Sequence, residues 1–162
     1  MGGALVGCGY TPVYGPGGGA AELRGAVRAR DPRNLNEFDF VTQLERRLGA
    51  PDAAKFDLNY SISTSVSQVT VTPERELTRF NVIGTLTFSV LPTGSSAPVT
   101  SGKVNNFAAY SVSPVAVATS PPRTSSTISA LSAKRDAYAR LMVALADQMV
   151  TQLLATSPDW AK

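Results

Sequence analysis

The sequence predicts an α+β fold: a four-stranded, mostly antiparallel sheet with two helices packed on one face, in the order β-α-β-β-β-α. Three observations predict it. Two long stretches alternate apolar and polar residues, two others place apolar residues at helical spacing, and clusters of Pro, Gly and Ser separate them. A chain of 162 residues is long enough to bury the core of one such domain.

The first expected elements are a short strand near residues 23–28 and a helix that begins after Asn34. Apolar or small residues alternate with others over 23–28, and residues 31–33 form a turn. Asn34 and Glu37 have the spacing of a capping box, which places a helix start here. The apolar residues that follow recur at helical intervals, namely Phe38, Val41, Leu44 and Leu48. A glycine and a proline then end the helix.

Two long strands follow, over residues 56–66 and 80–90. In each of them nearly every second residue is apolar, which is typical of a strand with one buried face. A fourth strand is expected over 99–112, with its apolar residues on the same face. A hairpin that turns at residues 73–75 would place apolar residues opposite each other, pairing Tyr60 with Phe88, Ile62 with Leu86 and Val66 with Val82.

The last third of the chain is expected to hold a loop and one long helix. Residues 111–127 are rich in Pro, Ser and Thr, which favours a flexible loop or a segment that orders on a partner. A helix over about 127–154 follows, and 157–162 would be a C-terminal tail. The helix carries one apolar stripe, made of Leu131, Tyr138, Leu141, Met142, Leu145, Met149 and Leu153.

The composition argues against several classes of protein. The chain has no His, one Cys and a formal net charge of +3. His is the usual proton shuttle and the commonest metal ligand, and Cys supplies the thiolates of most structural zinc sites. The basic residues are scattered and form no stripe that would follow a phosphate backbone. We therefore expect no enzyme, no metal, no bound cofactor and no nucleic-acid partner.

The amino terminus carries a motif with a specific chemistry. Residues 5–8, Leu-Val-Gly-Cys, resemble a bacterial lipobox, in which the cysteine thiol accepts diacylglycerol and becomes the mature amino terminus. We expect residues 1–7 to be the remainder of a signal peptide, because they contain no Lys or Arg and only a short apolar run. Cys8 would then be the lipid anchor, carrying an N-acyl diacylglycerol. Residues 8–21, rich in Gly and Pro, would form a flexible tether.

This terminus allows other interpretations. Cys8 can be an ordinary free thiol in an N-terminal tail. Myristoylation at Gly2 would need Ser or Thr at position 6, and the chain has Val6 there. No stretch of the sequence reaches the roughly 18 apolar residues of a membrane span. A protein anchored through Cys8 would therefore attach to a membrane without crossing it.

Three segments carry a resemblance to a known family. They are residues 8–15 (Cys-Gly-Tyr-Thr-Pro-Val-Tyr-Gly), 33–38 (Arg-Asn-Leu-Asn-Glu-Phe) and 134–141 (Lys-Arg-Asp-Ala-Tyr-Ala-Arg-Leu), the last continuing through 145–149. These segments, and the order in which they occur, resemble those of the lipopolysaccharide-assembly lipoproteins, the LptE family, and most closely those of its alphaproteobacterial branch. The resemblance covers residues 7–154, and one LptE-like domain is expected over 22–156.

The resemblance implies a non-enzymatic protein held on the periplasmic face of the outer membrane by its acylated cysteine. Members of the family plug the LptD β-barrel, assist the folding of that barrel and bind lipopolysaccharide during its delivery to the cell surface. The loop at 111–127 departs from the family pattern, so no residue is carried over from it. Two alternatives stand: another periplasm-facing lipoprotein that is a lipid carrier or an auxiliary subunit of a transport complex, and a cytoplasmic interaction domain with a chance cysteine.

The residues of the sheet point to a similar partner. The face opposite the helices is rich in Ser, Thr and Asn and poor in charge, so it can hydrogen-bond a polar barrel lumen without burying unpaired ions; it can also simply be solvated. Arg79 and Lys103 project from this face and are candidate contacts for lipopolysaccharide phosphates, with solvated strand charges as the alternative. The expected register places Lys103 opposite Thr87, so the two cations are not adjacent.

Overall fold

The computed structural model describes residues 19–69, 78–112 and 124–161. Its elements follow in the order α1 (Gly19–Leu23), β1 (Val27–Ala29), α2 (Leu35–Leu48), β2 (Phe56–Val69), β3 (Thr78–Pro92), β4 (Thr100–Val112) and α4 (Thr124–Trp160). The strands form one sheet in the order β1-β2-β3-β4, with β1 parallel to β2 and the other neighbours antiparallel. The predicted α+β fold is confirmed, with α1 as an additional short helix.

The register of the long strands is the one that the alternation of apolar residues predicts. Tyr60 lies opposite Phe88, Ile62 opposite Leu86 and Val66 opposite Val82. The next pair of strands places Thr87 opposite Lys103, also as predicted. A slip of one residue would turn every apolar side chain to the other face, so the buried face excludes such a slip. The turn predicted at 73–75 and most of the predicted loop lie outside the described residues.

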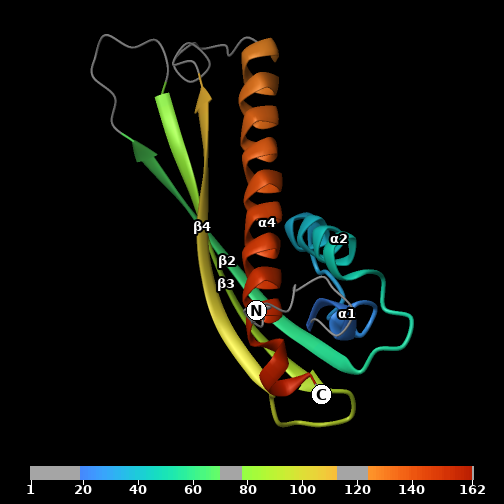
Figure 1. The fold of residues 1–162 in the computed structure, drawn as a ribbon. Coiled ribbons are helices and arrows are strands. Elements are labelled where there is room, and N and C mark those ends of the chain that lie inside the picture. Colours follow the sequence, from blue (N-terminus) through green and yellow to red (C-terminus); the bar gives the residue numbers. More distant parts are fainter. Residues whose placement is uncertain (1–18, 70–77, 113–123, 162) are drawn as a thin grey trace, which may run out of the picture.

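The two long helices cover the same face of the sheet (Figure 1). α4 runs along β3 and β4, and α2 packs against α4. The ring of Phe40 in α2 lies 4.9 Å from the ring of Tyr60 in β2. Gly84 lets α4 approach β3 closely, because a Cβ atom there would lie 3.0 Å from methyl groups of Leu141 and Leu145. The core therefore lies between the even-numbered residues of β2, β3 and β4, together with Val27 of β1, and these two helices.

The start of α2 confirms the predicted cap, with one change of partner. Asn34 Oδ1 accepts a hydrogen bond from the backbone N–H of Glu37 at 3.0 Å. The carboxylate of Glu37 in turn accepts from the backbone N–H of Arg33, one residue before the cap, at 2.9 Å. The helix ends at Leu48 because Gly49 adopts φ +83°, a left-handed conformation that favours glycine.

Two details near the amino terminus differ from the prediction. The first strand begins only at Val27, and Leu23 lies in α1. Gly25, with φ +67°, turns the chain between them. α1 also occupies Gly19–Leu23, so the predicted tether over 8–21 is helical at its end.

The buried stripe of α2 also differs from the prediction. Phe38 was expected to face the core, but its side chain is 56% exposed. Phe40 takes its place, because Phe40, Leu44 and Leu48 recur every four residues along one side of the helix. Phe38 lies on a neighbouring side, which turns away from the core.

α4 is longer than predicted at both ends. Leu131 was expected on the buried stripe but is 62% exposed, because this part of α4 rises past α2 (Figure 1). Residues 157–160 of the predicted tail belong to the helix, which runs through Trp160. Pro158 lacks the N–H that would bond the carbonyl of Leu154, and the hydroxyl of Ser157 donates to that carbonyl instead, at 3.0 Å.

Candidate functional site: the open face of the sheet

The face of the sheet that carries neither α2 nor α4, here called the open face, is built by the odd-numbered residues of β2, β3 and β4. All of its side chains are exposed or half-buried. The register sets them in rows across the three strands: Ser61, Thr87 and Lys103; Ser63, Thr85 and Asn105; Ser65, Ile83 and Phe107; Ser67, Asn81 and Ala109. Hydroxyl and amide groups dominate, so this face can donate and accept hydrogen bonds along most of its length.

Charge is scarce on the open face. β2, β3 and β4 contain three charged residues, Asp57, Arg79 and Lys103. Asp57 is paired with Arg28 of β1, whose guanidinium lies 2.7 Å from the carboxylate. Arg79 lies eight residues along β3 from Thr87, the residue opposite Lys103, which is roughly 26 Å in a strand. The two predicted contact residues are therefore far apart, as expected, and cannot hold one phosphate together.

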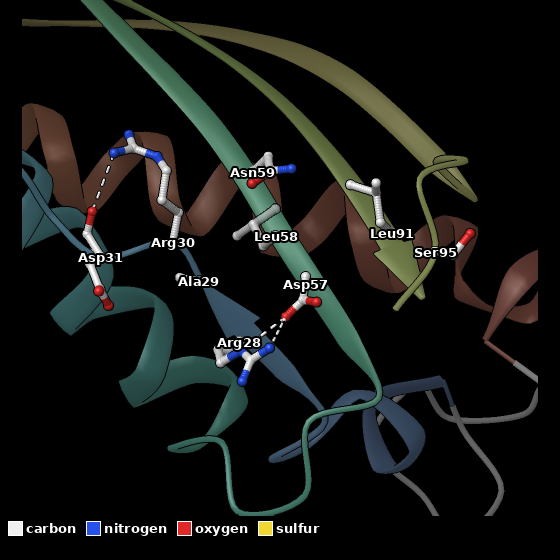
Figure 2. A pocket seen from close by; sticks show the side chains of 9 residues that line it. All are labelled: Arg28, Ala29, Arg30, Asp31, Asp57, Leu58, Asn59, Leu91 and Ser95. Carbon is white, nitrogen blue, oxygen red and sulfur yellow. Dashed lines mark hydrogen bonds and ion pairs between the residues drawn. The ribbon is translucent and has the colours of Figure 1, made fainter. Parts of the chain in front are cut away.

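A hollow of about 550 Å³ lies at the β1 end of the open face (Figure 2). It is lined by residues of β1 and the segment after it, of β2, and of the end of β3 and the segment after that, namely Arg28, Ala29, Arg30, Asp31, Asp57, Leu58, Asn59, Leu91 and Ser95. A second hollow of about 370 Å³ is lined by residues of β2, β3 and β4: Asn59, Tyr60, Ser61, Thr87, Phe88, Ser89 and Ser101. Because Asn59 lines both, the two hollows adjoin.

Both arginines of the larger hollow are engaged by other groups of the protein. Arg28 donates to Asp57 Oδ1 through Nε at 2.9 Å. Arg30 donates to the carbonyl oxygen of Asp31 at 3.2 Å, as Figure 2 shows, and to Glu37 Oε2 at 3.2 Å. Because each guanidinium already has a carboxylate beside it, this hollow suits a neutral hydrogen-bonding group better than a phosphate.

Tyr60 helps to line the smaller hollow and also belongs to the core. The guanidinium of Arg30 lies 4.5 Å from the centre of the Tyr60 ring, in a cation–π arrangement. The Tyr60 hydroxyl is buried and finds no hydrogen-bond partner among the described residues. Burial, and then the negative charge of Glu37, raise the pKa of Tyr60 to about 12. The phenol therefore stays protonated at neutral pH and contributes no titrating group to the site.

The remaining predictions about sites concern the anchor and metals. Cys8 lies outside the described residues, so its lipidation stays a prediction. Within the ranges that the structure describes, no three His, Cys, Asp or Glu residues gather as metal ligands would. No helix in those same ranges is both long and apolar enough to span a membrane.

The open face also carries an exposed apolar pair that was not predicted from the sequence. Ile83 and Phe107 lie opposite each other on β3 and β4, among serines, threonines and asparagines. The signal for this pair was present in the alternation itself. A large apolar residue at an odd position of these strands must lie on the polar face, and Ile83 and Phe107 are both such residues.

Comparison with known proteins gives a likeness in fold. No protein-family profile and no curated protein matches the sequence. The structure is similar to that of a provisionally named lipoprotein from Caulobacter crescentus CB15, with a TM-score of 0.65 and 14% identity over 87% of this chain and 96% of that one. It is also similar to a minor lipoprotein from Acinetobacter baumannii, with a TM-score of 0.52 and 11% identity over 81% of this chain and 91% of that one. The chain thus has a fold that occurs in bacterial lipoproteins.

Proposed function

We propose that this protein is a non-enzymatic outer-membrane lipoprotein of the lipopolysaccharide-assembly type, which plugs the LptD β-barrel, assists its folding and binds lipopolysaccharide. The observation that carries the proposal is the open face, which is long, rich in hydroxyl and amide groups, and poor in charge. The lumen of a membrane barrel is polar. A plug needs surfaces that hydrogen-bond such a wall without burying unpaired ions, each of which would cost several kcal/mol.

The fold and the amino terminus support the anchored part of this proposal. The two structural neighbours are both bacterial lipoproteins by name. Residues 5–8 have the lipobox pattern, which makes Cys8 the site of acylation. An acylated Cys8 would hold the domain at the periplasmic face of the outer membrane, next to its barrel partner.

Arg79 and Lys103 are the candidate contacts for lipopolysaccharide. In the part of the chain that the structure describes, no carboxylate lies within ion-pair distance of either side chain. A cation without such a neighbour is available to a phosphate. Because the two residues lie far apart, they would contact separate phosphate groups.

Co-purification from the native outer membrane tests the barrel partnership. Detergent extraction of the tagged, full-length protein should recover a large β-barrel protein in equimolar amount, identified by mass spectrometry. Recovery of the lipoprotein without any barrel would contradict the proposal. It would favour the alternative of a lipid carrier or an auxiliary subunit of a transport complex.

Metabolic labelling tests the anchor separately. Cells grown with labelled palmitate should incorporate the label into the wild type but not into the Cys8→Ala variant. The variant should move to the soluble periplasm and keep its circular dichroism spectrum, because the core lies in residues 23–161. Absence of label from the wild type would remove the anchor and leave the cytoplasmic interaction domain as the better hypothesis.

A further inference from the structure

An apolar pair stands in the middle of the polar open face. Ile83 and Phe107 lie directly opposite each other, and their side chains are 42% and 64% exposed. Ser65 completes their row on β2. An aromatic side chain offers a large apolar surface at a small cost in side-chain entropy, which is why aromatic residues are common anchors of protein interfaces.

Backbone groups of β4 at and near Phe107 already make hydrogen bonds within the protein. The side chain of Phe107 is therefore the part that a partner can contact. The backbone N–H of Phe107 donates to the side chain of Asn106 at 2.8 Å. The carbonyl of Ala109, two residues further along β4, accepts from Arg140 of α4 at 3.0 Å. These bonds occupy backbone groups that an added strand would use, so a partner meets this part of β4 from the open face rather than along its edge.

The rows around the pair carry no charge. The row of Ile83 and the rows on either side of it consist of serine, threonine, asparagine, alanine and the apolar pair. Lys103 lies beyond them at one end and Arg79 at the other. An aromatic centre, an uncharged polar surround and charges at the margin together form the usual pattern of a protein–protein interface.

The charges discriminate between possible partners. A second copy would set the cations of one open face against those of the other, and Asp57, the acidic residue of β2–β4, is already paired with Arg28. An anionic membrane surface would call for a cluster of cations and a broader apolar face than two side chains supply. A neutral, polar protein wall that contains an apolar recess fits this surface best. The recess would accept the aromatic centre, and the polar wall would face the three uncharged rows, with the cations Arg79 and Lys103 at their margins.

We propose that Ile83 and Phe107 anchor this protein to the inner wall of its β-barrel partner by filling an apolar recess in that wall. The inference rests on the proposed function and deepens it, since it assigns the open face to the wall. The helix-bearing side, with α2 and α4, then faces the rest of the lumen.

Site-specific photo-crosslinking tests this assignment. The full-length, lipidated protein is produced in its native bacterium with p-benzoylphenylalanine at position 107 or at position 38. Phe38 is a matched control, because it is the same residue type, is 56% exposed and lies on α2, on the helix-bearing side. Irradiation should join position 107 to an outer-membrane β-barrel identified by mass spectrometry, with a yield roughly tenfold above that from position 38.

Substitutions give a second, independent readout. Phe107→Thr suits a strand and Phe38→Gln suits a helix, so both variants should fold, which circular dichroism checks. Phe107→Thr should lower the amount of co-purified barrel by roughly tenfold, as expected for an anchor residue, and Phe38→Gln should change it by less than about twofold.

The outcomes separate this inference from the proposed function. If the wild type retains no barrel, the proposed function fails and the inference with it. If the wild type retains the barrel but crosslinks to it only from position 38, the inference alone is overturned. Crosslinks from position 107 to a second copy or to lipopolysaccharide, or full barrel retention by a folded Phe107→Thr protein, also overturn it.

Discussion

Glu37 and Arg30 form an ion pair at the boundary of the core, with Arg30 Nη2 3.2 Å from Glu37 Oε2 and little of either side chain exposed. The same carboxylate oxygen accepts the backbone N–H of Arg33 at 2.9 Å. The guanidinium of Arg30 also donates to the carbonyl of Tyr60 at 3.1 Å. One pair of side chains thus joins the end of β1, the start of α2 and the middle of β2.

Removing the carboxylate should therefore be costly. Glu37→Ala is expected to lower the free energy of unfolding by roughly 2–3 kcal/mol, because it leaves a half-buried guanidinium and a backbone N–H without their acceptor. Urea denaturation measures the loss. Glu45→Ala, at an exposed position of the same helix, is the matched control and should change stability by less than about 0.5 kcal/mol. Equal losses for both variants would contradict a structural role for the Glu37 carboxylate.

Tyr60→Phe should behave differently from most core substitutions. At neutral pH we expect unchanged stability or a gain of up to about 1 kcal/mol, because the variant removes a buried hydroxyl that has no partner among the described residues. The ring contacts with Phe40 and Arg30 are retained. Urea denaturation at neutral pH checks this expectation, and a loss above about 1 kcal/mol would show that the hydroxyl is hydrogen-bonded after all.

The same variant isolates an effect of alkaline pH. The pKa of Tyr60 is raised from 10.0 to about 12 in the folded protein, chiefly by burial, so above pH 10 the unfolded chain loses this proton first. The stability of the wild type should then fall as pH rises from about 10 to 12, by roughly 2–3 kcal/mol in total from this group, with no contribution below that range. Tyr60→Phe lacks this loss, so its advantage over the wild type should widen between those pH values. A constant difference in unfolding free energy would contradict the raised pKa.

The strand register was predictable because one face of the sheet is buried. The alternation excludes a slip of one residue, and the turn expected at residues 73–75 then selects the frame in which Tyr60 lies opposite Phe88. The buried stripe of α2 was not predictable in the same way. That stripe includes the carboxylate of Glu37, and its burial depends on Arg30, which comes from another element.

The candidate site, likewise, was predictable from the sequence only in part. The polar, charge-poor character of the open face follows from the residues of β2–β4 alone. The larger hollow also needs β1, whose start depends on the left-handed turn at Gly25, and that turn has no strong signal in the local pattern. The end of α4 was not predicted, because a proline usually ends a helix. Here the helix continues past Pro158, and the Ser157 hydroxyl donates to the Leu154 carbonyl that Pro158 leaves without a backbone donor.

Two glycines of the sheet should differ in their tolerance of a methyl group. At Gly102 a Cβ atom would lie 2.6 Å from Cζ of Phe88, a buried ring that cannot easily move. At Gly84 the nearest atoms are leucine methyl groups at 3.0 Å, which can shift by a few tenths of an ångström. We expect Gly102→Ala to cost about 1–3 kcal/mol and Gly84→Ala less than about 1 kcal/mol, measured by thermal and urea unfolding. The reverse order would show that α4, rather than Phe88, is the rigid neighbour.

Trp160 should fasten the end of α4 to the sheet. Its ring meets that of Phe56 edge-on at 5.1 Å, and its Nε1 donates to Thr156 Oγ1 at 3.1 Å. Trp160→Ala should therefore lower the free energy of unfolding by roughly 1–3 kcal/mol, and Trp160→Phe, which keeps an aromatic ring, should lower it less.

Trp160 is the one tryptophan of the sequence, so its fluorescence reports on this contact directly. In the wild type, the fluorescence and circular dichroism transitions in urea should coincide if the end of α4 unfolds with the core. An earlier fluorescence transition, together with an unchanged stability of Trp160→Ala, would show that residues 157–162 are the detached tail that the sequence alone predicts.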